Sequence, residues 1–181
     1  QDVSSGGSAT STTINSGGLL SVFGGSAVGI TQNSGGIISA DTSATLSGTN
    51  INGSFSIAGG SASNMLLENG GSLTVLNGHQ ATSTTINSGG YQFVSSGGSA
   101  TSTTINSGGE QLVSSGGSAT STTINGIGFQ TVYSGGSAIN TTLNTGGIQS
   151  ISGGSATSTT INRLGGQYVS SGGSATGTTI N

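Results

Sequence analysis

The sequence predicts an all-β fold, a right-handed parallel β-helix or solenoid of about ten coils, each of about 17–19 residues, that spans residues 1–181 as one repeat domain. Three observations predict it. One phrase recurs along the whole chain, columns of apolar residues keep a fixed offset from that phrase, and pairs of glycine separate the columns. Repeats of roughly 20 residues are typical of solenoids, because a unit that small cannot bury its apolar face alone and must stack on its neighbours.

The recurring phrase contains an alanine that marks each coil. The stretch VSSGGSATSTTINSGG at 94–109 is repeated almost unchanged from Val113, and its core is already present at residues 4–10. Because a flexible linker needs no fixed period, the regularity argues against a linker despite the 37 glycines. The marker alanines, which recur at a nearly constant spacing, are Ala9, Ala27, Ala44, Ala62, Ala81, Ala100, Ala119, Ala138, Ala156 and Ala175.

Two apolar columns flank the alanine and predict the inward faces of short strands. Their residues are mostly β-branched and are separated by Gly-Gly turns, a pattern that favours strands over helices. Five residues after the alanine stand Ile14, Leu67, Ile86, Ile105, Ile124, Leu143, Ile161 and Ile180. Six residues before it stand Val3, Val75, Val94, Val113, Val132 and Val169, and the column is joined by Ile57 and Ile151 and, in the shorter coils, by Val22 and Ala40.

A third inward column changes from apolar to amide side chains along the chain. It holds Leu20, Ile38, Phe55 and Leu73, and then Gln92, Gln111, Gln130, Gln149 and Gln167. Residues two apart share one face of a strand, so the second half is predicted to bury a ladder of glutamines that bond to one another. A file of asparagines, interrupted by Glu68, lies beside the isoleucines: Asn15, Asn33, Asn50, Asn87, Asn106, Asn125, Asn144, Asn162 and Asn181.

The chain has few groups that titrate or coordinate metals. They are Asp2, Asp41, Glu68, Glu110, Arg163 and His79, spread over different coils and columns. We therefore expect no enzymatic activity, catalytic residue, cofactor or metal ion, and His79 is interpreted as a solvated residue of a turn. The formal net charge of −3 offers no basic surface for nucleic acid, and no apolar run approaches the roughly 20 residues of a membrane span, so we expect no membrane insertion.

Outward positions carry hydroxyls in files, and these are candidate O-glycosylation sites. The serine before the alanine points outward because the alanine points inward. This set comprises Ser8, Ser26, Ser61, Ser99, Ser118, Ser137, Ser155 and Ser174, and the residues from Ser99 onward are expected to be modified first. A second set beside the Gly-Gly corner comprises Ser96, Ser115 and Ser171. Coils about 4.8 Å apart leave room for sugars on only a subset. Alternatively, the hydroxyls only solubilise a surface that lacks charge.

Large apolar residues at outward positions predict a second functional surface. Tyr91, Phe93, Leu112, Phe129 and Tyr168 lie on neighbouring coils with little charge around them. Exposed apolar residues that gather on one face are typical of interaction sites, and a low net charge weakens repulsion between copies. We therefore expect self-association along this face.

Units reading SSGGSATSTTINSGGxQxV resemble the repeats of self-associating autotransporter passengers, the AIDA-type adhesins. The similarity is carried by residues 94–109 and by LVSSGGSATSTTIN at 112–125, covers nearly all of the chain and is weakest at 28–57. It implies a right-handed β-helix that is exported through an outer-membrane barrel and displayed on, or secreted from, a Gram-negative cell. It also implies roles in adhesion, autoaggregation and biofilm growth.

The same resemblance implies partners. They are a dedicated heptosyltransferase, which modifies many serines of such passengers, a second copy on a neighbouring cell, and the host cell surface. Since the sequence QDVSSGG at the start resembles no signal peptide, and no barrel follows, the chain is expected to be an excised segment.

Two alternatives from other functional classes stay open. An ice-binding solenoid would also present regular threonines, as in the STTIN unit, although alternation turns Thr103 inward with Ile105 and leaves only Ser102 and Thr104 outward. A polysaccharide-processing β-helix would need clustered carboxylates on adjacent coils, and the sequence does not contain such a cluster.

Overall fold

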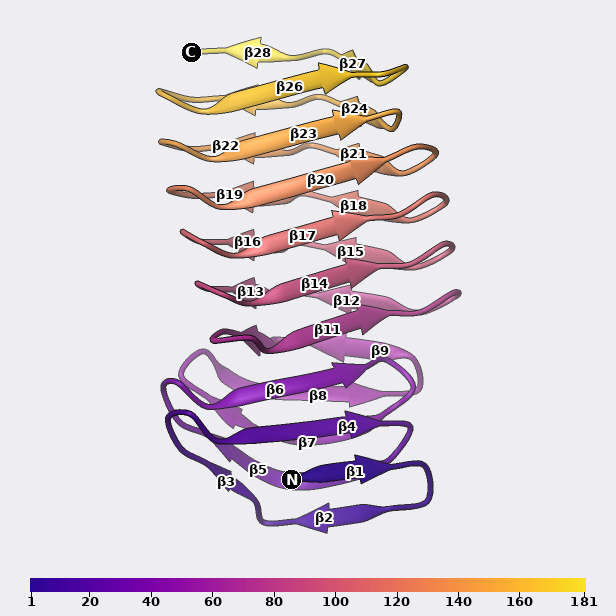
Figure 1. Ribbon diagram of the computed structural model, residues 1–181, viewed down its shortest axis with the longest axis vertical. Helices are drawn as coiled ribbons and strands as arrows, with labels where there is room; N and C mark the ends of the chain where they lie inside the picture. The colour runs from indigo at the N-terminus through magenta and orange to yellow at the C-terminus, as the bar shows by residue number, and fades with distance from the viewer.

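The structure, a computed structural model, describes residues 1–181 as 28 β-strands without a helix. The chain climbs as a right-handed coil with three walls, from the N-terminal coils at the bottom of Figure 1 to the C-terminal coils at the top. Coils pair mainly through parallel strands. The predicted all-β, right-handed parallel solenoid is therefore confirmed.

The wall nearest the viewer in Figure 1 is a parallel sheet of nine strands, here called the front sheet. In spatial order its strands are β1 (Asp2–Ser4), β4 (Leu19–Phe23), β6 (Ile37–Asp41), β11 (Ser72–Val75), β14 (Tyr91–Val94), β17 (Glu110–Val113), β20 (Phe129–Tyr133), β23 (Ile148–Ser152) and β26 (Gly166–Ser170). These strands of three to five residues are long enough to alternate clearly between the inside and the outside of the coil.

Two further sheets close the coil behind the front sheet. The twelve-stranded rear sheet, apart from its side strand β3 (Thr13–Ile14), contains β2 (Ser8–Thr10), β5 (Ser26–Gln32), β7 (Thr45–Asn50), β8 (Gly53–Ala58), β9 (Ser61–Ser63), β12 (Gln80–Thr82), β15 (Ser99–Thr101), β18 (Ser118–Thr120), β21 (Ser137–Ile139), β24 (Ser155–Thr157) and β27 (Ser174–Thr176). The short sheet contains β10 (Leu66–Leu67), β13 (Thr85–Ile86), β16 (Thr104–Ile105), β19 (Thr123–Ile124), β22 (Thr142–Leu143), β25 (Thr160–Ile161) and β28 (Thr179–Ile180).

The coils stack in register, so each sequence column becomes a file of side chains. Ala100 lies opposite Ala119, and Ile105 opposite Ile124. Val113 in the front sheet is fully buried, as is Ile105 in the short sheet. The predicted valine, alanine and isoleucine columns therefore form the interior from β11 to β24, whereas their last members, Val169, Ala175 and Ile180, are exposed in the C-terminal coil.

The middle of the chain departs from the predicted regular coil. Strand β7 pairs antiparallel with β8, and β8 pairs antiparallel with β9, so the chain doubles back within the rear sheet. Phe55 and Ile57 belong to this rear sheet, and their assignment to the front-sheet columns was wrong. Leu46 stands opposite Ala27 and Ile57 opposite Ala62, which leaves Ala44 outside the alanine file. The reversal removes one coil, and the front sheet has nine strands, close to the expected ten coils.

The front sheet continues across this reversal with a shift of two residues. Strand β6 pairs directly with β11, so Leu73 stacks on Ala40 instead of on Ile38. Thr42 follows β6 and is fully buried, and its Oγ1 accepts a hydrogen bond from Leu76 N at 3.0 Å.

His79 also belongs to this junction. Its Nδ1 lies 2.8 Å from the Thr42 hydroxyl oxygen, and its ring is half-buried against Gly60, where an added Cβ would lie 2.9 Å from the imidazole Cδ2. The interpretation of His79 as a solvated turn residue was wrong, because the ring joins two segments that the reversal brings together.

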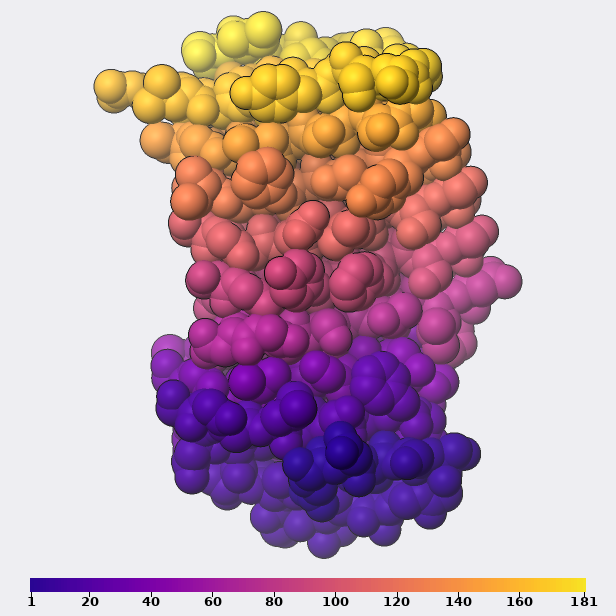
Figure 2. Space-filling model, viewed as in Figure 1, coloured from indigo at the N-terminus to yellow at the C-terminus, as the bar shows by residue number.

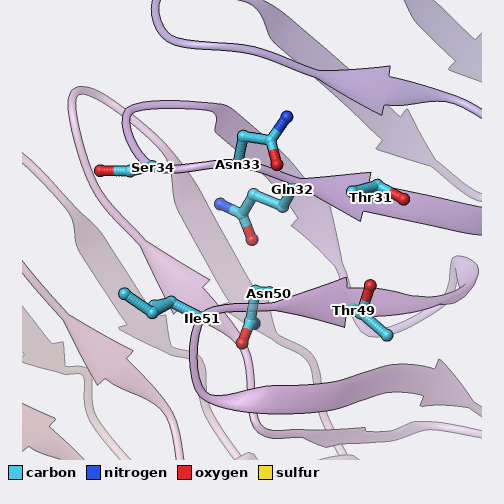
Figure 3. Close-up of a pocket in the computed structure, with 7 residues that line it drawn as sticks. All are labelled: Thr31, Gln32, Asn33, Ser34, Thr49, Asn50 and Ile51. Atoms are coloured by element: carbon cyan, nitrogen blue, oxygen red, sulfur yellow. The ribbon is translucent and has the colours of Figure 1, made fainter.

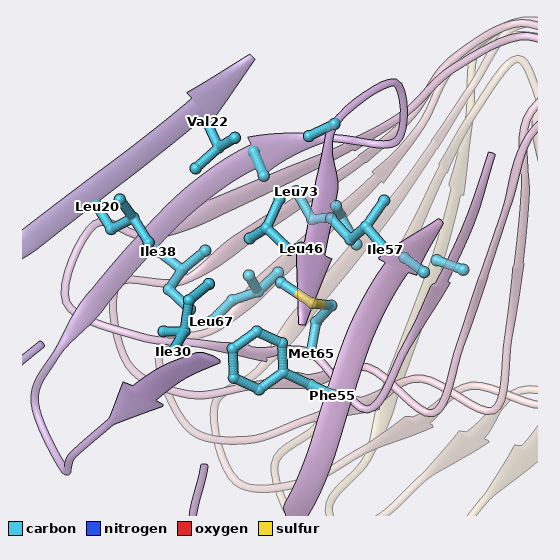
Figure 4. Packing of buried hydrophobic residues seen from close by; sticks show 14 of the residues in the cluster. Leu20, Val22, Ile30, Ile38, Leu46, Phe55, Ile57, Met65, Leu67 and Leu73 are labelled. Carbon is cyan, nitrogen blue, oxygen red and sulfur yellow. The ribbon is translucent and has the colours of Figure 1, made fainter. Parts of the chain in front are cut away.

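Large apolar side chains fill the interior around the reversal. Figure 4 shows Phe55 and Met65 among Ile30, Leu46 and Leu67, between the walls of the coil. Phe55 is 2% exposed and Met65 is fully buried. The four strands β5, β7, β8 and β9 face this space from the rear sheet, so the wider interior is occupied by larger side chains than the alanines and valines of the upper coils.

The upper coils bury the predicted glutamine ladder. Gln111 Nε2 donates to Gln92 Oε1 at 2.7 Å, and Gln130 and Gln149 repeat this contact at 2.7 Å. Buried threonines complete the network, since Thr103 Oγ1 donates to Gln92 Oε1 at 3.1 Å and accepts from Gln111 Nε2 at 3.1 Å. This glutamine–threonine spine separates two apolar groups, the isoleucine file and the valine and alanine files.

The asparagine file is also present, with two differences from the prediction. Asn106 Nδ2 donates to Asn87 Oδ1 at 2.9 Å, and the pattern continues to Asn181. Glu68 continues the file, because its Oε2 accepts from Asn87 at 3.3 Å while its Oε1 accepts from Gly35 N at 2.7 Å. Asn50 lies outside it and donates instead to Asn64 O at 3.0 Å.

Candidate functional site

The serines before the alanines form an outward file on the rear sheet. In the upper coils the file is unbroken, with directly opposite neighbours at Ser99, Ser118, Ser137, Ser155 and Ser174. The first three are half-buried, whereas Ser155 and Ser174 are exposed. In the lower coils the file is interrupted, because Ser8 stands opposite Ser26 but Ser61 stands opposite Gln80. The geometry therefore forms one continuous file of predicted sites in the upper half and brings together only Ser8 and Ser26 in the lower half.

The corner serines are more exposed than most of this file. Ser96 and Ser115 lie in the turns after the front-sheet strands and are both exposed. A Cβ added to Gly116 would lie 2.8 Å from Ser96 Oγ, and one added to Gly135 would lie 2.6 Å from Ser115 Oγ. The glycine of the next coil thus leaves room for each serine hydroxyl. Ser171 is exposed at an equivalent corner with φ 44°.

A further file of exposed serines was left out of the predicted acceptor sites, although alternation had placed its member Ser102 outward. The corner between the rear and short sheets places serines at φ between 53° and 58°, a left-handed conformation that is uncommon outside glycine. The signal was available, because the same column carries Gly29, Asn64, Asn140 and Gly177, residue types that favour this conformation. The serines of this file are Ser11, Ser83, Ser102, Ser121 and Ser158.

The large outward apolar residues gather on the outer face of the front sheet, as expected. The Tyr91 and Phe93 rings are stacked with centroids 6.2 Å apart, and Phe93 stands opposite Leu112. The outer face of this sheet is the side of the molecule that Figure 2 presents to the viewer. Phe129 is 41% exposed and Tyr168 is 62% exposed.

The sequence reasoning left out Tyr133, Leu19 and Phe23, which are also exposed on this sheet. Alternation could have identified them, because the odd-numbered residues of their strands point outward.

Charged groups are dispersed over the molecule. Two of the four acids serve local structure, because Asp41 accepts from the Ser43 backbone N at 2.9 Å and Glu68 bonds Gly35 and Asn87. Of the other two, Asp2 begins β1 and Glu110 stands between Tyr91 and Phe129 on neighbouring coils. No group of three or more acidic, histidine or cysteine residues is placed to hold a metal ion. No helix is long and apolar enough to span a membrane.

Comparison with known proteins agrees with this geometry. Residues 47–109 match the family described as adhesin of bacterial autotransporter system, probable stalk. A crystal structure of a TibC-catalyzed hyper-glycosylated TibA fragment superposes with a TM-score of 0.65 and 47% identity, covering 98% of this chain and 66% of that one. The chain belongs to the AIDA-type autotransporter passengers. Passengers of this type are displayed on, or secreted from, the surface of Gram-negative bacteria.

A curated relative of this AIDA-type passenger is autotransporter CRAC of Citrobacter rodentium (strain ICC168). It is 56% identical over 41 residues, which are 23% of this chain and 3% of the relative. The chain therefore spans a small part of that relative and about two thirds of the TibA fragment. These relatives are adhesin-type passengers and not known enzymes.

Proposed function

We propose that the chain is an adhesive, self-associating stalk segment and an acceptor for O-linked heptose. It would act in autoaggregation, in biofilm growth and in contact with host cells. The observation that supports the acceptor role most directly is the exposed, repeated Ser-Gly-Gly corner on a fold shared with a passenger fragment that is itself hyper-glycosylated.

Exposure decides which serines are the better acceptors. Neighbouring coils are about 4.8 Å apart, so two serines directly opposite each other cannot both carry a sugar ring without splaying. Ser96 and Ser115 also lie in adjacent coils, so spacing limits both sets alike, but Ser96 and Ser115 are exposed whereas Ser99 and Ser118 are half-buried. The expected order is therefore reversed, and we propose the corner serines as the first acceptors.

A pair of matched variants tests the acceptor role. The chain is co-expressed with a TibC-type heptosyltransferase, and its intact mass is compared with that of the unmodified chain. Ser96→Ala with Ser115→Ala should remove more heptose masses than Ser99→Ala with Ser118→Ala, at equal fold stability. Equal masses with and without the enzyme would contradict the acceptor role, and a larger loss in the second variant would contradict the corner preference.

The front sheet supports a particular geometry for self-association, because its outer columns are complementary to themselves when a second copy is inverted. One column reads Tyr91, Glu110, Phe129, Ile148 and Gly166 in consecutive coils, and the other reads Phe93, Leu112, Thr131, Ser150 and Tyr168. A twofold axis parallel to the strands, placed between the coils of Phe129 and Ile148, would bring Phe129 against Ile148 of the second copy. It would also bring Leu112 against Tyr168 of the second copy.

The same axis would pair the charges. It places Glu110 against the coil whose front-sheet strand follows the corner at Arg163. Arg163 is exposed and is the only lysine or arginine of the chain. Two symmetric Glu110–Arg163 contacts would then flank an apolar centre. Exposed ion pairs contribute little affinity but fix register, so we propose an antiparallel pairing of two copies along the front sheet.

A charge-swap experiment tests this pairing. In the Glu110→Arg variant, and equally in the Arg163→Glu variant, two residues of like charge face each other across the axis. Each variant should therefore associate less than the parent in light scattering or cell-settling assays. An equimolar mixture of the two restores both opposite-charge contacts and should associate again. Asp2→Arg, the same change at an exposed front-sheet position outside the proposed overlap, is the control.

Two outcomes would contradict different parts of the proposal. A mixture that associates no better than its components would contradict the antiparallel register. Unchanged clumping after Leu112, Phe129 and Tyr168 are all replaced by serine would contradict the use of this face altogether.

A further inference from the structure

The chain reversal opens a hollow on the outside of the coil. Strands β5 and β7 are paired as far as Thr31 and Thr49, and the chain beyond Asn50 turns into the β7–β8 hairpin instead of forming a regular corner above Asn33. The resulting open depression has a volume of about 350 Å³. A water molecule takes up roughly 30 Å³ of liquid, so the hollow is larger than a site for one or two waters and falls in the size range of small-molecule sites.

The lining is polar and uncharged. Thr31, Ser34 and Thr49 contribute hydroxyls, Asn33 and Asn50 contribute amides, and Gln32 completes the polar wall. The single apolar member is Ile51, whose side chain is 79% exposed at the rim. An uncharged wall of hydroxyls and amides next to one exposed aliphatic side chain matches a neutral, polyhydroxylated ring, which has hydroxyls on its rim and C–H groups on its face.

An unpartnered acceptor lies at this site. Gln32 is 3% exposed, and its Nε2 donates to Gly36 O at 2.9 Å and to Leu66 O at 3.1 Å, which fixes the orientation of the amide. Its Oε1 has no hydrogen-bond partner. Figure 3 shows the Gln32 side chain in the gap between the two segments, with its oxygen on the side of Asn50. A buried acceptor without a donor is costly, so a hydroxyl that enters the gap would gain a bond that the protein alone does not supply.

A second acceptor is free for the same structural reason. In the upper coils each asparagine oxygen accepts from the amide of the next coil, as Asn106 Oδ1 does from Asn125 at 3.1 Å. Asn33 donates to Asn15 at 2.8 Å, but Asn50, the expected next donor, bonds Asn64 O instead. The wall therefore has more free acceptors than donors, which disfavours an anion and favours a ligand with several hydroxyl donors.

We propose that this hollow binds a neutral saccharide, with Gln32 Oε1 and Asn33 Oδ1 accepting from its hydroxyls and Ile51 packing on a C–H face. The source could be a glycan of another cell or a sugar carried by a second copy, since both present the same chemistry. The site is independent of the acceptor serines and of the front sheet.

Saturation-transfer NMR on the intact, unmodified chain tests the site. The probes are glucose, galactose, mannose, N-acetylglucosamine and an L-glycero-D-manno-heptoside at millimolar concentrations, and a heptosylated copy of the chain serves as the second source. Thr49→Val with Ser34→Ala keeps nearly the same volume but removes two lining hydroxyls, and should weaken binding at least tenfold. Thr10→Val, at an exposed threonine of β2 outside the hollow, should bind like the parent.

Gln32→Ile gives a second readout. It places the residue of Ile14 and Ile86 at this position and removes the unpartnered oxygen together with the two bonds that Nε2 donates, so it should abolish saccharide binding while far-UV circular dichroism shows an intact fold. Binding of free sugars but not of the heptosylated copy would assign the source to other glycans, and the reverse would assign it to sister copies. Absence of binding to every probe, or binding unchanged by Thr49→Val with Ser34→Ala, would overturn the proposal.

Discussion

Replacing a single residue of the glutamine–threonine spine should lower the free energy of unfolding. The loss per replaced residue should be larger than when the whole spine is replaced. Gln130 makes four buried hydrogen bonds, with Gln111, Thr122, Thr141 and Gln149. Net contributions of about 1 kcal/mol each give a loss of about 4 kcal/mol in Gln130→Leu. Burial of the leucine side chain regains about 2 kcal/mol, leaving a net loss of about 2 kcal/mol in the free energy of unfolding.

Thermal melts followed by far-UV circular dichroism measure this change. For a chain of this length about 2 kcal/mol corresponds to a fall of roughly 4–8 °C in the melting temperature. The control is Gln80→Leu, because Gln80 is exposed on the outer face of β12 and should tolerate leucine with little change. A Gln130→Leu variant as stable as Gln80→Leu would refute the claim that the amide ladder stabilises the upper coils.

Replacing the entire spine provides the complementary measurement. With Gln92, Gln111, Gln130 and Gln149 changed to leucine and the intervening Thr103, Thr122 and Thr141 changed to valine, no polar partner is left alone between the ends. The lower coils already fill this column with Val3, Val22, Ala40 and Leu73. The cost per residue should therefore fall well below that of the single variant, because the penalty comes from unpaired groups and not from the absence of amides.

The remaining predictions concern packing, the junction and the alternative function. Ile105→Asp buries an unpaired charge in the core and should unfold several coils, whereas Ser99→Ala should leave the melting curve nearly unchanged; equal losses would contradict their inward and outward assignment. Glu68→Ala should lower stability by about 1–2 kcal/mol in urea unfolding, since it leaves Gly35 N and the Asn87 amide without their acceptor, and an unchanged midpoint would show that Glu68 does not join the two asparagine segments. A thermal-hysteresis assay should detect no ice binding, and a clear activity would favour the ice-binding alternative instead.

The regular coils could be predicted from the sequence because all of their columns repeat with the same spacing. From Ala81 onward, residues of one column pair directly with their counterparts in the next coil, so the alanine, glutamine and isoleucine files could be assigned from spacing and alternation alone. The glutamine ladder followed from the same step, because a buried amide is tolerated where an identical neighbour satisfies it.

The chain reversal was not predicted because the spacing of the repeat hardly changes across it. Ala44 lies nearly midway in sequence between Ala27 and Ala62, so the alanine repeat continues without a break through a segment that folds as a hairpin. The Asn52–Gly53 dipeptide was a local signal for a hairpin turn, and the structure places the two turn residues at Ile51 and Asn52. Periodicity describes which residues stack, but it does not reveal a segment that pairs with itself.

The surfaces were only partly predictable for a related reason. Alternation placed Tyr91 and Phe93 outward, but the shift of two residues between β6 and β11 decides which outward residues of the lower and upper coils are neighbours, and that shift required the structure. The hollow beside Gln32 depends on the reversal and could not be found without it.

Electron-transfer peptide mapping of the chain co-expressed with a TibC-type heptosyltransferase tests whether the repeated phrase is both a folding unit and an acceptor sequence. We expect heptose on the exposed corner serines Ser96, Ser115 and Ser171, with lower occupancy at Ser99, Ser118 and Ser137 and no simultaneous modification of directly opposite serines. Sugars confined to the threonines of the STTIN units, or no sugar at all, would contradict it.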